Sequence, residues 1–423
     1  MKMKILIWDT NLATAHAERL KEDGNEVKYF TFWATSGFPD FIEFVPGNGL
    51  VDKTIYFFDY VDWADLIYFP DCGMGDLVDF LRKNTDKPVW GAGSGEVLEL
   101  NRWKAIEILK ELGILTPESE LIVGVDNLEK FLRKTKEPVF IKFNIFRGSQ
   151  ETFNFPRYVE RFDKVLELKL SKLRLDFGPF YNDVNFIVQR ATGEVEPGFD
   201  LIFNGDKFLE PCAYGFEIKG QGCQIEKFVP TIDDLPESIK ETAVKLIPFL
   251  KKVGYRGAIS NEGRVGKDTN GRMAVIDICA RWFYPGSAMY TIKDLIGNYT
   301  EIIEKVAKGE DVKIDVKYPY AFSMTLSSVE ALNNWLDIDF DKKYRDRIRL
   351  RIACQKDGVY YAVPGFESVV TIVGVGDTWE EAYEDAVRIY EKSKLQAYGL
   401  SKPIKKEIVE EIINKAKDYG IDF

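Results

Sequence analysis

Histidine is almost absent from this 423-residue sequence, and no nucleophile is accompanied by the residues that would activate it. The one histidine, His16, lies in a segment with a helical pattern, and we interpret it as a structural residue. Neither a Cys-His pair nor a Ser-His-Asp set therefore supports hydrolase chemistry. The cysteines are scattered and lack metal-ligand spacing; they are Cys72, Cys212, Cys223, Cys279 and Cys354. They predict a reduced, cytoplasmic environment.

Long apolar runs and an excess of basic residues are missing as well. No window approaches the roughly 18 consecutive apolar residues that a membrane span needs. The apolar run at residues 5–8 ends at Asp9, which makes it too short for the core of a signal peptide and predicts a buried strand. The net charge is −11, which argues against a polymeric nucleic acid as partner but leaves a nucleotide-like substrate open. No Gly-x-Gly-x-x-Gly fingerprint follows the first strand, which argues against bound NAD.

What is present is an alternation of strand and helix patterns, typical of a multidomain protein with α/β and α+β parts. We expect a domain over 1–95 with a parallel sheet, a domain over 96–320 with lobes of about 96–185 and 186–320, and an α+β domain over 321–423. The first domain is predicted to contain strands 4–8, 26–32, 65–70 and 87–91 with helices 12–23 and 75–84. The second is predicted to contain helices 98–112, 127–134 and 236–252, strands 119–123, 138–142, 186–190, 257–265 and 273–279, a loop over 144–183, and a hairpin that turns at Asn204-Gly205.

Two segments are basic within this acidic chain, residues 164–174 and 342–351. In the second, charged residues alternate with Ile348 and Leu350, which predicts a strand with one face in water. Recognition of an anionic substrate is the alternative interpretation.

Five charged residues in a fixed order outline a site that could activate a substrate with ATP. Lys104 and Lys142 can hold phosphates as compact point charges. Glu262 and Asp277 lie on predicted neighbouring strands and offer the hard oxygen ligands that magnesium prefers. Arg281 follows them and can stabilise negative charge on a transferring phosphoryl group. A lone lysine in a helix or at a strand end is ordinarily a solvated surface residue, so the order of all five residues carries the interpretation.

The motifs around these residues resemble those of ATP-grasp ligases, and within that superfamily they are most similar to phosphoribosylamine-glycine ligase, the glycinamide ribonucleotide synthetase of purine biosynthesis. The matching segments run along the whole chain: 46–49 (PGNG), 91–104 (GAGSGEVLELNRWK), 138–142 (PVFIK), 254–257 (GYRG), 275–281 (VIDICAR) and 373–382 (VGVGDTWEEA). The resemblance implies an ATP-grasp fold, ATP and Mg²⁺ or Mn²⁺ as cofactors, and a cytoplasmic monomer or homodimer. It also implies that a small-molecule carboxylate and an amine are joined into an amide through an acyl phosphate, with release of ADP and phosphate.

The same resemblance assigns roles to individual residues. It implies catalytic roles for Arg281 and Lys219, metal ligands in Glu262 and Asp277, and nucleotide contacts by Lys104, Lys142, Arg147, Gln189, Arg190 and Glu196. Arg147 lies in the loop 144–152, which has a single glycine where the family has a Gly-rich phosphate flap. Gln189 lies in the strand whose backbone would read adenine, although a buried interior strand explains its apolar half equally well. For Lys219 an exposed loop position is as good an interpretation as a phosphate contact.

Several departures from the family pattern concern the substrate. Cys279 stands where the family has an asparagine, and sulfur is a poor ligand for magnesium. The first strand is followed by residues 8–17 (WDTNLATAHA) instead of a Gly-rich turn, and Asp9 there would repel a phosphate. Residues 283–286 (FYPG) replace the acidic GDPE segment. We therefore expect a carboxylate-amine ligase that joins an amino acid to a diverged amine. The alternatives are the purine-pathway reaction itself and a catalytically silent nucleotide-binding paralogue.

Overall fold

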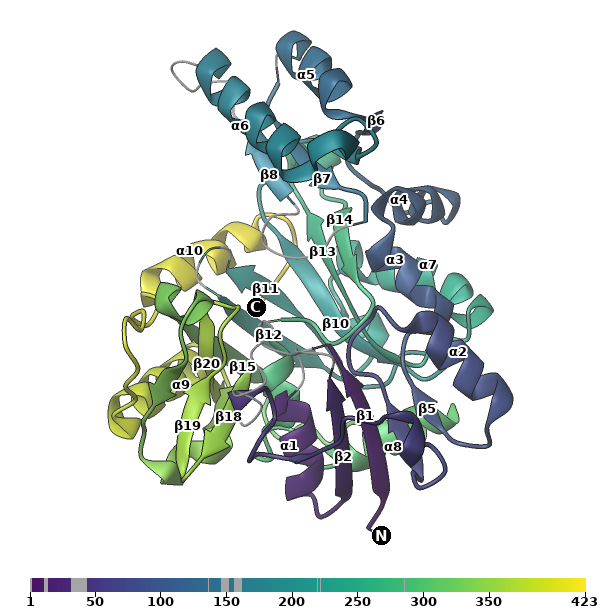
Figure 1. Cartoon of the computed structure of the whole chain (residues 1–423). Coiled ribbons are helices and arrows are strands. Elements are labelled where there is room, and N and C mark those ends of the chain that lie inside the picture. The colour runs from purple at the N-terminus through teal and green to yellow at the C-terminus, as the bar shows by residue number, and fades with distance from the viewer. Residues whose placement is uncertain are drawn as a thin grey trace. The chain divides into compact units, whose positions relative to one another are not determined.

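The computed structural model describes residues 2–10, 14–31, 44–135, 137–145, 152–155, 162–218, 220, 222–284 and 286–423. The chain divides into two compact units, whose elements are labelled in Figure 1. Unit 1 comprises Met1–Glu96, Glu196–Asn261 and Cys279–Phe423, and unit 2 comprises Val97–Val195 and Glu262–Ile278. The three-domain division made from the sequence stays a prediction.

Unit 1 begins with a parallel sheet in the order β3-β2-β1-β4-β5. Its strands are β1 (Lys4–Asp9), β2 (Glu26–Thr31), β3 (Asp52–Lys53), β4 (Leu66–Tyr68) and β5 (Val89–Trp90), with helices α1 (Thr14–Glu22) and α2 (Gly75–Asn84) in the connections. Every residue of β1 after Lys4 is buried, as expected for a parallel strand covered on both faces. Trp8 packs against the rings of Phe30, Phe57 and Phe69. The parallel N-terminal sheet predicted from the sequence is confirmed.

A larger, eight-stranded sheet has the order β14-β13-β10-β11-β12-β15-β20-β17, and its strands β13 and β14 include residues of the segment Glu262–Ile278 of unit 2. Its strands are β10 (Pro197–Phe203), β11 (Cys212–Ile218), β12 (Cys223–Val229), β13 (Gly257–Arg264), β14 (Ala274–Cys279), β15 (Tyr320–Ser327), β17 (Ile348–Leu350) and β20 (Ser368–Gly376). The hairpin after β10 turns where expected: Phe203 bridges Phe208, and Gly205 has a φ of 100°, a conformation that favours glycine.

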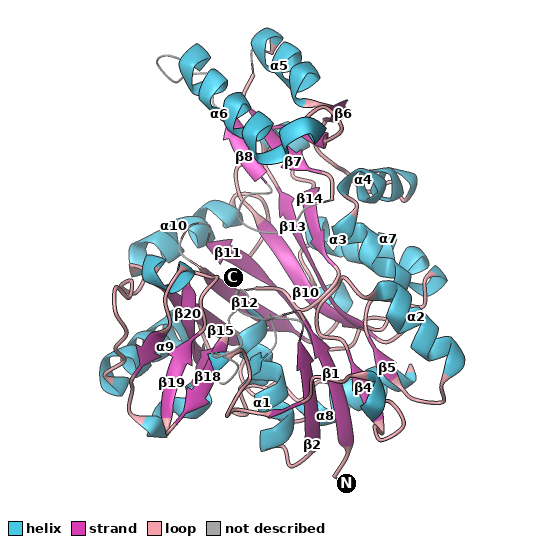
Figure 2. Cartoon of the chain, viewed as in Figure 1, coloured by secondary structure: helices cyan, strands magenta, loops and turns pink. Residues whose placement is uncertain are grey.

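The remaining elements of unit 1 are helices and one small sheet, shown by type in Figure 2. They are the sheet β16 (Leu336–Ile338), β19 (Val359–Ala362) and β18 (Ala353–Lys356), and the helices α7 (Glu237–Lys252), α8 (Tyr299–Lys308), α9 (Trp379–Ser393) and α10 (Lys406–Lys417). Thr378 caps α9, because its side chain accepts a hydrogen bond from the backbone N–H of Glu381.

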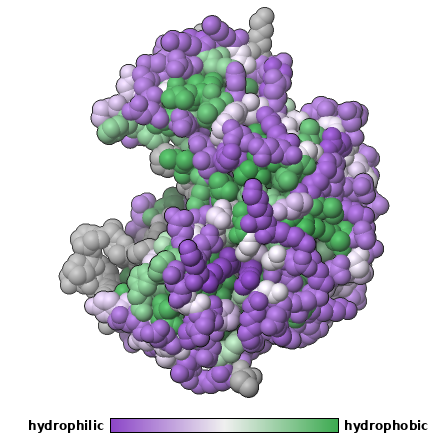
Figure 3. All heavy atoms as spheres, turned by 90° about the vertical axis from the view of Figure 1, so that its right-hand side faces the viewer, coloured by the Kyte–Doolittle hydropathy of each residue, from purple (hydrophilic) through white to green (hydrophobic). Residues whose placement is uncertain are grey.

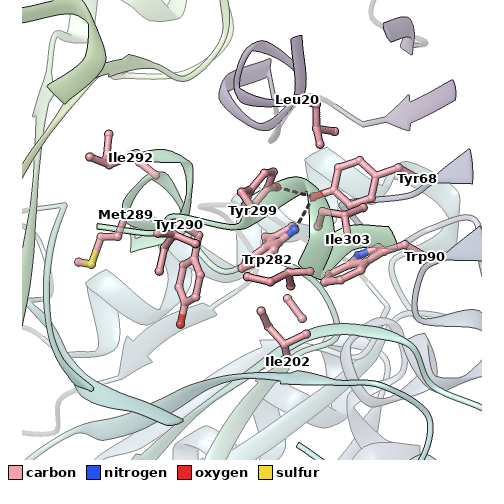
Figure 4. Close-up of a cluster of buried hydrophobic side chains, with 14 of the residues drawn as sticks. Leu20, Tyr68, Trp90, Ile202, Trp282, Met289, Tyr290, Ile292, Tyr299 and Ile303 are labelled. Carbon is pink, nitrogen blue, oxygen red and sulfur yellow. Dashed lines mark hydrogen bonds between the residues drawn. The ribbon is translucent and has the colours of Figure 1, made fainter. Parts of the chain in front are cut away.

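An aromatic cluster lies in the core of unit 1 (Figure 4). The rings of Trp90 and Trp282 stack with their centroids 5.7 Å apart. The indole N–H of Trp282 donates to the hydroxyl of Tyr68 at 2.5 Å, and that hydroxyl lies 3.1 Å from the hydroxyl of Tyr299. Buried polar groups of these large side chains are thus paired inside the core, as they need to be.

The segment 342–351 differs from the expected half-solvated strand. Residues Lys342–Arg347 form a short 3₁₀ helix, η9, and only Ile348–Leu350 form the strand β17. The side chain of Arg349 is 1% exposed and donates to both carboxylate oxygens of Glu22. Arg345 forms an ion pair with one carboxylate oxygen of Glu18. The prediction of a solvent-exposed strand face was wrong, because alternating arginines can also face inward when they form ion pairs with acidic side chains.

Unit 2 contains a four-stranded sheet in the order β6-β9-β7-β8. Its strands are β6 (Ser119–Val123), β7 (Val139–Phe143), β8 (Thr152–Phe155) and β9 (Asn185–Arg190), and its helices are α3 (Val97–Leu100), α4 (Arg102–Glu111), α5 (Val125–Lys134) and α6 (Phe162–Phe177). The prediction of a loop over 144–183 was wrong, since this segment contains β8 and α6. Leu166 and Leu170 of α6 are buried while Leu168 and Leu175 are exposed, so apolar residues surround the helix and blur its period.

No helix in the described part of the chain is long and apolar enough to cross a membrane. The face shown in Figure 3 carries mostly hydrophilic residues, with hydrophobic ones gathered between them.

Candidate functional site

A pocket lies within unit 2, between the start of α4 and the strands β7, β9 and β14. It is lined by Leu98, Arg102, Ala105, Ile106, Leu109, Lys142, Ile187, Gln189, Val275, Ile276, Asp277 and Ile278. Most of these side chains are aliphatic, and the polar ones are few. The lining combines apolar walls with a few polar groups, and the open volume is about 20 Å³, which is room for about one water molecule.

The polar residues Arg102, Lys142 and Asp277 meet in this pocket. Arg102 Nη2 lies 3.5 Å from Asp277 Oδ2, and Lys142 Nζ lies 3.9 Å from the same oxygen. Both cations also donate to backbone carbonyl oxygens, Arg102 to Phe143 at 3.1 Å and Lys142 to Ile276 at 2.6 Å. Both side chains are about 6% exposed, so their charges interact in a medium less polar than water.

Helix α4 explains why Arg102 and not Lys104 reaches the pocket. Asn101 caps the helix and accepts a hydrogen bond from the backbone N–H of Lys104 at 3.1 Å. Arg102, Ala105, Ile106 and Leu109 then share one helical face, at the spacing i, i+3, i+4 and i+7.

Lys104 points elsewhere: its side chain is half exposed and forms an ion pair with Glu107 at 3.0 Å. The structure therefore does not bring Lys104 to the pocket, and Arg102 was missed from the sequence. The apolar periodicity of the helix was the signal that could have found it.

On β9, too, one of two neighbouring residues lines the pocket and the other faces away from it. Gln189 is buried, lines the pocket and donates to the hydroxyl of Ser119 at 3.2 Å. Arg190 alternates to the other side of the strand, where it is 55% exposed and pairs with Glu118 at 2.8 Å and Glu137 at 3.3 Å. Of the two residues expected near adenine, only Gln189 lines the pocket.

The two expected metal ligands lie on neighbouring strands of unit 2, Glu262 on β13 and Asp277 on β14. Both are partly exposed, and Asp277 lines the pocket. Among the described residues, no three His, Cys, Asp or Glu side chains are grouped so that they could hold a metal ion by themselves. Two carboxylates fit Mg²⁺ nonetheless, because this ion usually takes one or two carboxylates together with phosphate oxygens and water.

Comparisons with known proteins give matches to the fold of this chain but not to its sequence. No family model and no curated protein matches the sequence. Solved structures do match. The phosphoribosylamine-glycine ligase of Thermotoga maritima is 18% identical, with a TM-score of 0.68 over 94% of this chain and 98% of that one. The chain has the ATP-grasp fold.

Two further structures share this fold over nearly their whole length. The biotin carboxylase domain of the Hydrogenobacter thermophilus 2-oxoglutarate carboxylase, in complex with MgADP, ADP and bicarbonate, is 13% identical, with a TM-score of 0.66 over 100% of this chain and 96% of that one. N5-carboxyaminoimidazole ribonucleotide synthetase from Thermotoga maritima is 15% identical, with a TM-score of 0.59 over 93% and 99%. The fold expected from the sequence motifs is confirmed, and the site has to be argued from this chain's own residues.

Two further expected site residues of this chain do not line the pocket of unit 2. Arg281 and Glu196 belong to unit 1. Arg281 Nε lies 3.4 Å from Asp71 Oδ1, and its Nη1 donates to the carbonyl oxygen of Trp282 at 2.8 Å. Glu196 is partly buried directly before β10. Arg147 and Lys219 lie outside the described residues.

Strand β1 ends at a buried acidic residue. Asp9 is fully buried and accepts a hydrogen bond from the hydroxyl of Tyr29 at 2.5 Å. His16 on α1 is also buried, with its Nδ1 hydrogen-bonded to the hydroxyl of Tyr299. Burial, aided by the positive charge of Arg349, lowers the pKa of His16 to about 3. His16 is thus a neutral core residue, in agreement with its structural interpretation.

Proposed function

We propose that the protein is an ATP-dependent carboxylate-amine ligase. The observation that carries this proposal is the convergence of Arg102, Lys142 and Asp277 at the polar part of an otherwise aliphatic pocket, within an ATP-grasp fold. Aliphatic walls beside two cations and a carboxylate have the chemistry that a nucleotide needs, because its base is flat and its phosphates are anionic.

The residues divide into roles along the nucleotide. Gln189 and the aliphatic walls would hold the base, and Arg102 and Lys142 would bind phosphate oxygens. Asp277 and Glu262 would hold Mg²⁺, which neutralises charge on the phosphates when bound. Family resemblance is the support for the roles expected of five other residues, which are Arg147, Arg190, Glu196, Lys104 and Lys219. For Lys104 and Arg190 the geometry favours surface positions.

The proposed reaction needs positioned charges and no protein nucleophile. A substrate carboxylate oxygen bonds to the γ-phosphorus of ATP, the bond to ADP breaks, and an acyl phosphate forms. The amine nitrogen then bonds to the acyl carbon, phosphate leaves, and the nitrogen releases a proton. Arg281 can stabilise the negative charge that develops on the transferring group. The near absence of histidine is compatible with this chemistry.

The test is release of ADP from ATP and Mg²⁺ with candidate carboxylates and amines, with the product mass read from the same reaction. The wild type should release ADP only when both substrates are present, and Lys142→Ala should abolish the release. Equal activity of wild type and Lys142→Ala would contradict the assignment of the site.

A second candidate is the reaction of phosphoribosylamine-glycine ligase itself. It is supported by the TM-score of 0.68 with the Thermotoga maritima enzyme over nearly the whole of both chains. Glycine and freshly generated phosphoribosylamine should then give ADP and the mass of glycinamide ribonucleotide. Binding of ATP without turnover, with any substrate pair, would instead favour a silent nucleotide-binding paralogue.

A further inference from the structure

A second polar cluster lies within unit 1, on one face of its antiparallel sheet. It consists of Asp200 on β10, Gln224 and Glu226 on β12, and Ser323 on β15. Glu226 and Ser323 are fully buried, and Asp200 and Gln224 are at most 6% exposed. Polar side chains at such depth require partners.

The register of the strands places small residues beside Glu226. The residues directly opposite one another across β10, β11, β12 and β15 are Gly198, Gly215, Glu226 and Ala321. Glu226 is therefore the one large side chain in its row. A Cβ at Gly215 would lie 1.8 Å from the carbonyl oxygen of Ile225, so a glycine is required there. Gln224 lies directly opposite Ser323, which places both on the same face.

After the hydrogen bonds inside the cluster are counted, two buried oxygen atoms have no partner among the described residues. Gln224 Nε2 donates to Asp200 Oδ2 at 2.6 Å and to Glu226 Oε1 at 3.0 Å. Glu226 Oε2 and Ser323 Oγ are both buried, and neither has a hydrogen-bond partner among the described residues. The remaining need is for a donor with several N–H or O–H groups.

The charges point the same way. Burial, and then the negative charge of Asp200, raise the pKa of Glu226 well above its usual value. Within the described residues, no lysine or arginine forms an ion pair with Glu226. Two carboxyl groups this close can both ionise only if a cation enters between them.

We propose that Asp200, Gln224, Glu226 and Ser323 bind a small ammonium cation, which is the amine substrate of the ligase. This step rests on the proposed function. An ammonium ion carries one positive charge and several N–H donors, which matches two carboxylates, a free carboxylate oxygen and a free hydroxyl. When it binds, the proton held by the carboxyl pair leaves to solvent, so the charge inside the cluster stays balanced.

The segment that covers the cluster agrees with this role. Gly286 begins the short 3₁₀ helix η7 (Gly286–Thr291), and a Cβ there would lie 2.7 Å from Gln224 Oε1. Tyr290 of the same helix donates to the backbone carbonyl of Asp200 at 3.2 Å. Residues 283–286 are also the place where the sequence departs from the family's acidic GDPE segment. A closed cover and a small cluster select a small cation.

The test is thermal unfolding in ammonium chloride, potassium chloride, sodium chloride and tetramethylammonium chloride at equal ionic strength. Ammonium should raise the Tm of the wild type by about 2 °C or more beyond sodium, and Glu226→Gln should lose this rise. Glu237→Gln, at an exposed position of α7, is the matched control and should keep it. The same rise in wild type and Glu226→Gln, or an equal rise with potassium, would overturn the proposal. If Glu226→Gln does not fold, Ser323→Ala replaces it with the same expected loss.

Activity separates this inference from the proposed function. If ammonium raises the Tm but no carboxylate supports release of ADP from ATP, the cation site is supported and the ligase activity is rejected. If other amines support ADP release but ammonium changes neither the Tm nor the turnover, the ligase activity is supported and the cation site is rejected. ADP release that depends on ammonium in the wild type and is lost in Glu226→Gln supports both.

Discussion

The ammonium nitrogen of Lys142 on β7 lies 3.9 Å from a carboxylate oxygen of Asp277 on β14, and it donates a 2.6 Å hydrogen bond to the carbonyl of the preceding residue, Ile276. The cation is thereby fixed against the strand that also carries a proposed metal ligand. A buried lysine held by a carbonyl and a carboxylate keeps its position and can meet an anionic phosphate there.

Removal of this lysine should weaken nucleotide binding selectively. A charge-assisted hydrogen bond contributes about 1.5–3 kcal/mol, so Lys142→Ala should weaken ATP affinity by roughly 10- to 100-fold. Lys104→Ala is the matched control, because Lys104 is half exposed and pairs with Glu107 outside the pocket. Its ATP affinity should stay within about twofold of the wild type. Titration of ATP and Mg²⁺ into both variants measures the difference, and a larger loss in Lys104→Ala would restore the assignment made from the sequence.

Arg102 should depend on its planar shape as well as its charge. Its guanidinium spans the carbonyl oxygen of Phe143 and the carboxylate of Asp277, and lysine cannot span both. Arg102→Lys should therefore weaken ATP affinity by about tenfold while the charge at the site is kept. The Tm should fall as well, because the carbonyl of Phe143 loses a donor. Unchanged ATP affinity in a folded Arg102→Lys variant would exclude a phosphate contact by this residue.

The sequence predicted best where one periodicity dominated. The buried run 5–8 and the helical pattern of 75–84 correspond closely to β1 and α2, because a parallel strand and a half-buried helix leave clear patterns. Helix α6 was missed, since exposed Leu168 and Leu175 hide its buried face. The order of motifs along the chain was sufficient for the fold, which the structural matches confirm.

The site was harder to predict because it depends on which side chain of a pair faces inward. Family resemblance aligned Lys104 with a lysine that binds phosphate. In the structure, helix α4 begins after its cap at Asn101, and Arg102 is the residue that lines the pocket. Pairs of residues that are far apart in sequence, such as Glu226 and Asp200, leave no periodic signal at all. Their proximity follows from strand order and register, which a single sequence does not contain.

Loss of Arg349 should destabilise unit 1 strongly. Its guanidinium donates to both carboxylate oxygens of Glu22, at 2.9 and 3.1 Å, and to the carbonyl oxygen of Thr291 at 2.7 Å. Arg349→Met removes both of these hydrogen bonds from the Glu22 carboxylate and one of the two donors to the Thr291 carbonyl, and we expect the free energy of unfolding to fall by about 3–5 kcal/mol. Lys343→Met in the same segment is the control, because Lys343 is 64% exposed and its pair with Asp341 should contribute less than about 1 kcal/mol. Chemical denaturation of both variants measures the difference, and similar losses would show that Arg349 is not a buried anchor.

His16 should make the stability depend on pH between neutrality and mild acid. Its pKa is about 3 in the folded protein against 6.5 for an unperturbed histidine. Between these values the unfolded chain binds a proton that the folded chain does not, so this stability is present above pH 6.5 and is lost as the pH falls. From pH 7 to pH 5 the loss from this residue should reach about 2 kcal/mol. His16→Gln cannot titrate, so its free energy of unfolding, measured in denaturant at both pH values, should fall by that much less than the wild type's. Parallel pH profiles of the two proteins would mean that His16 is protonated in the folded core.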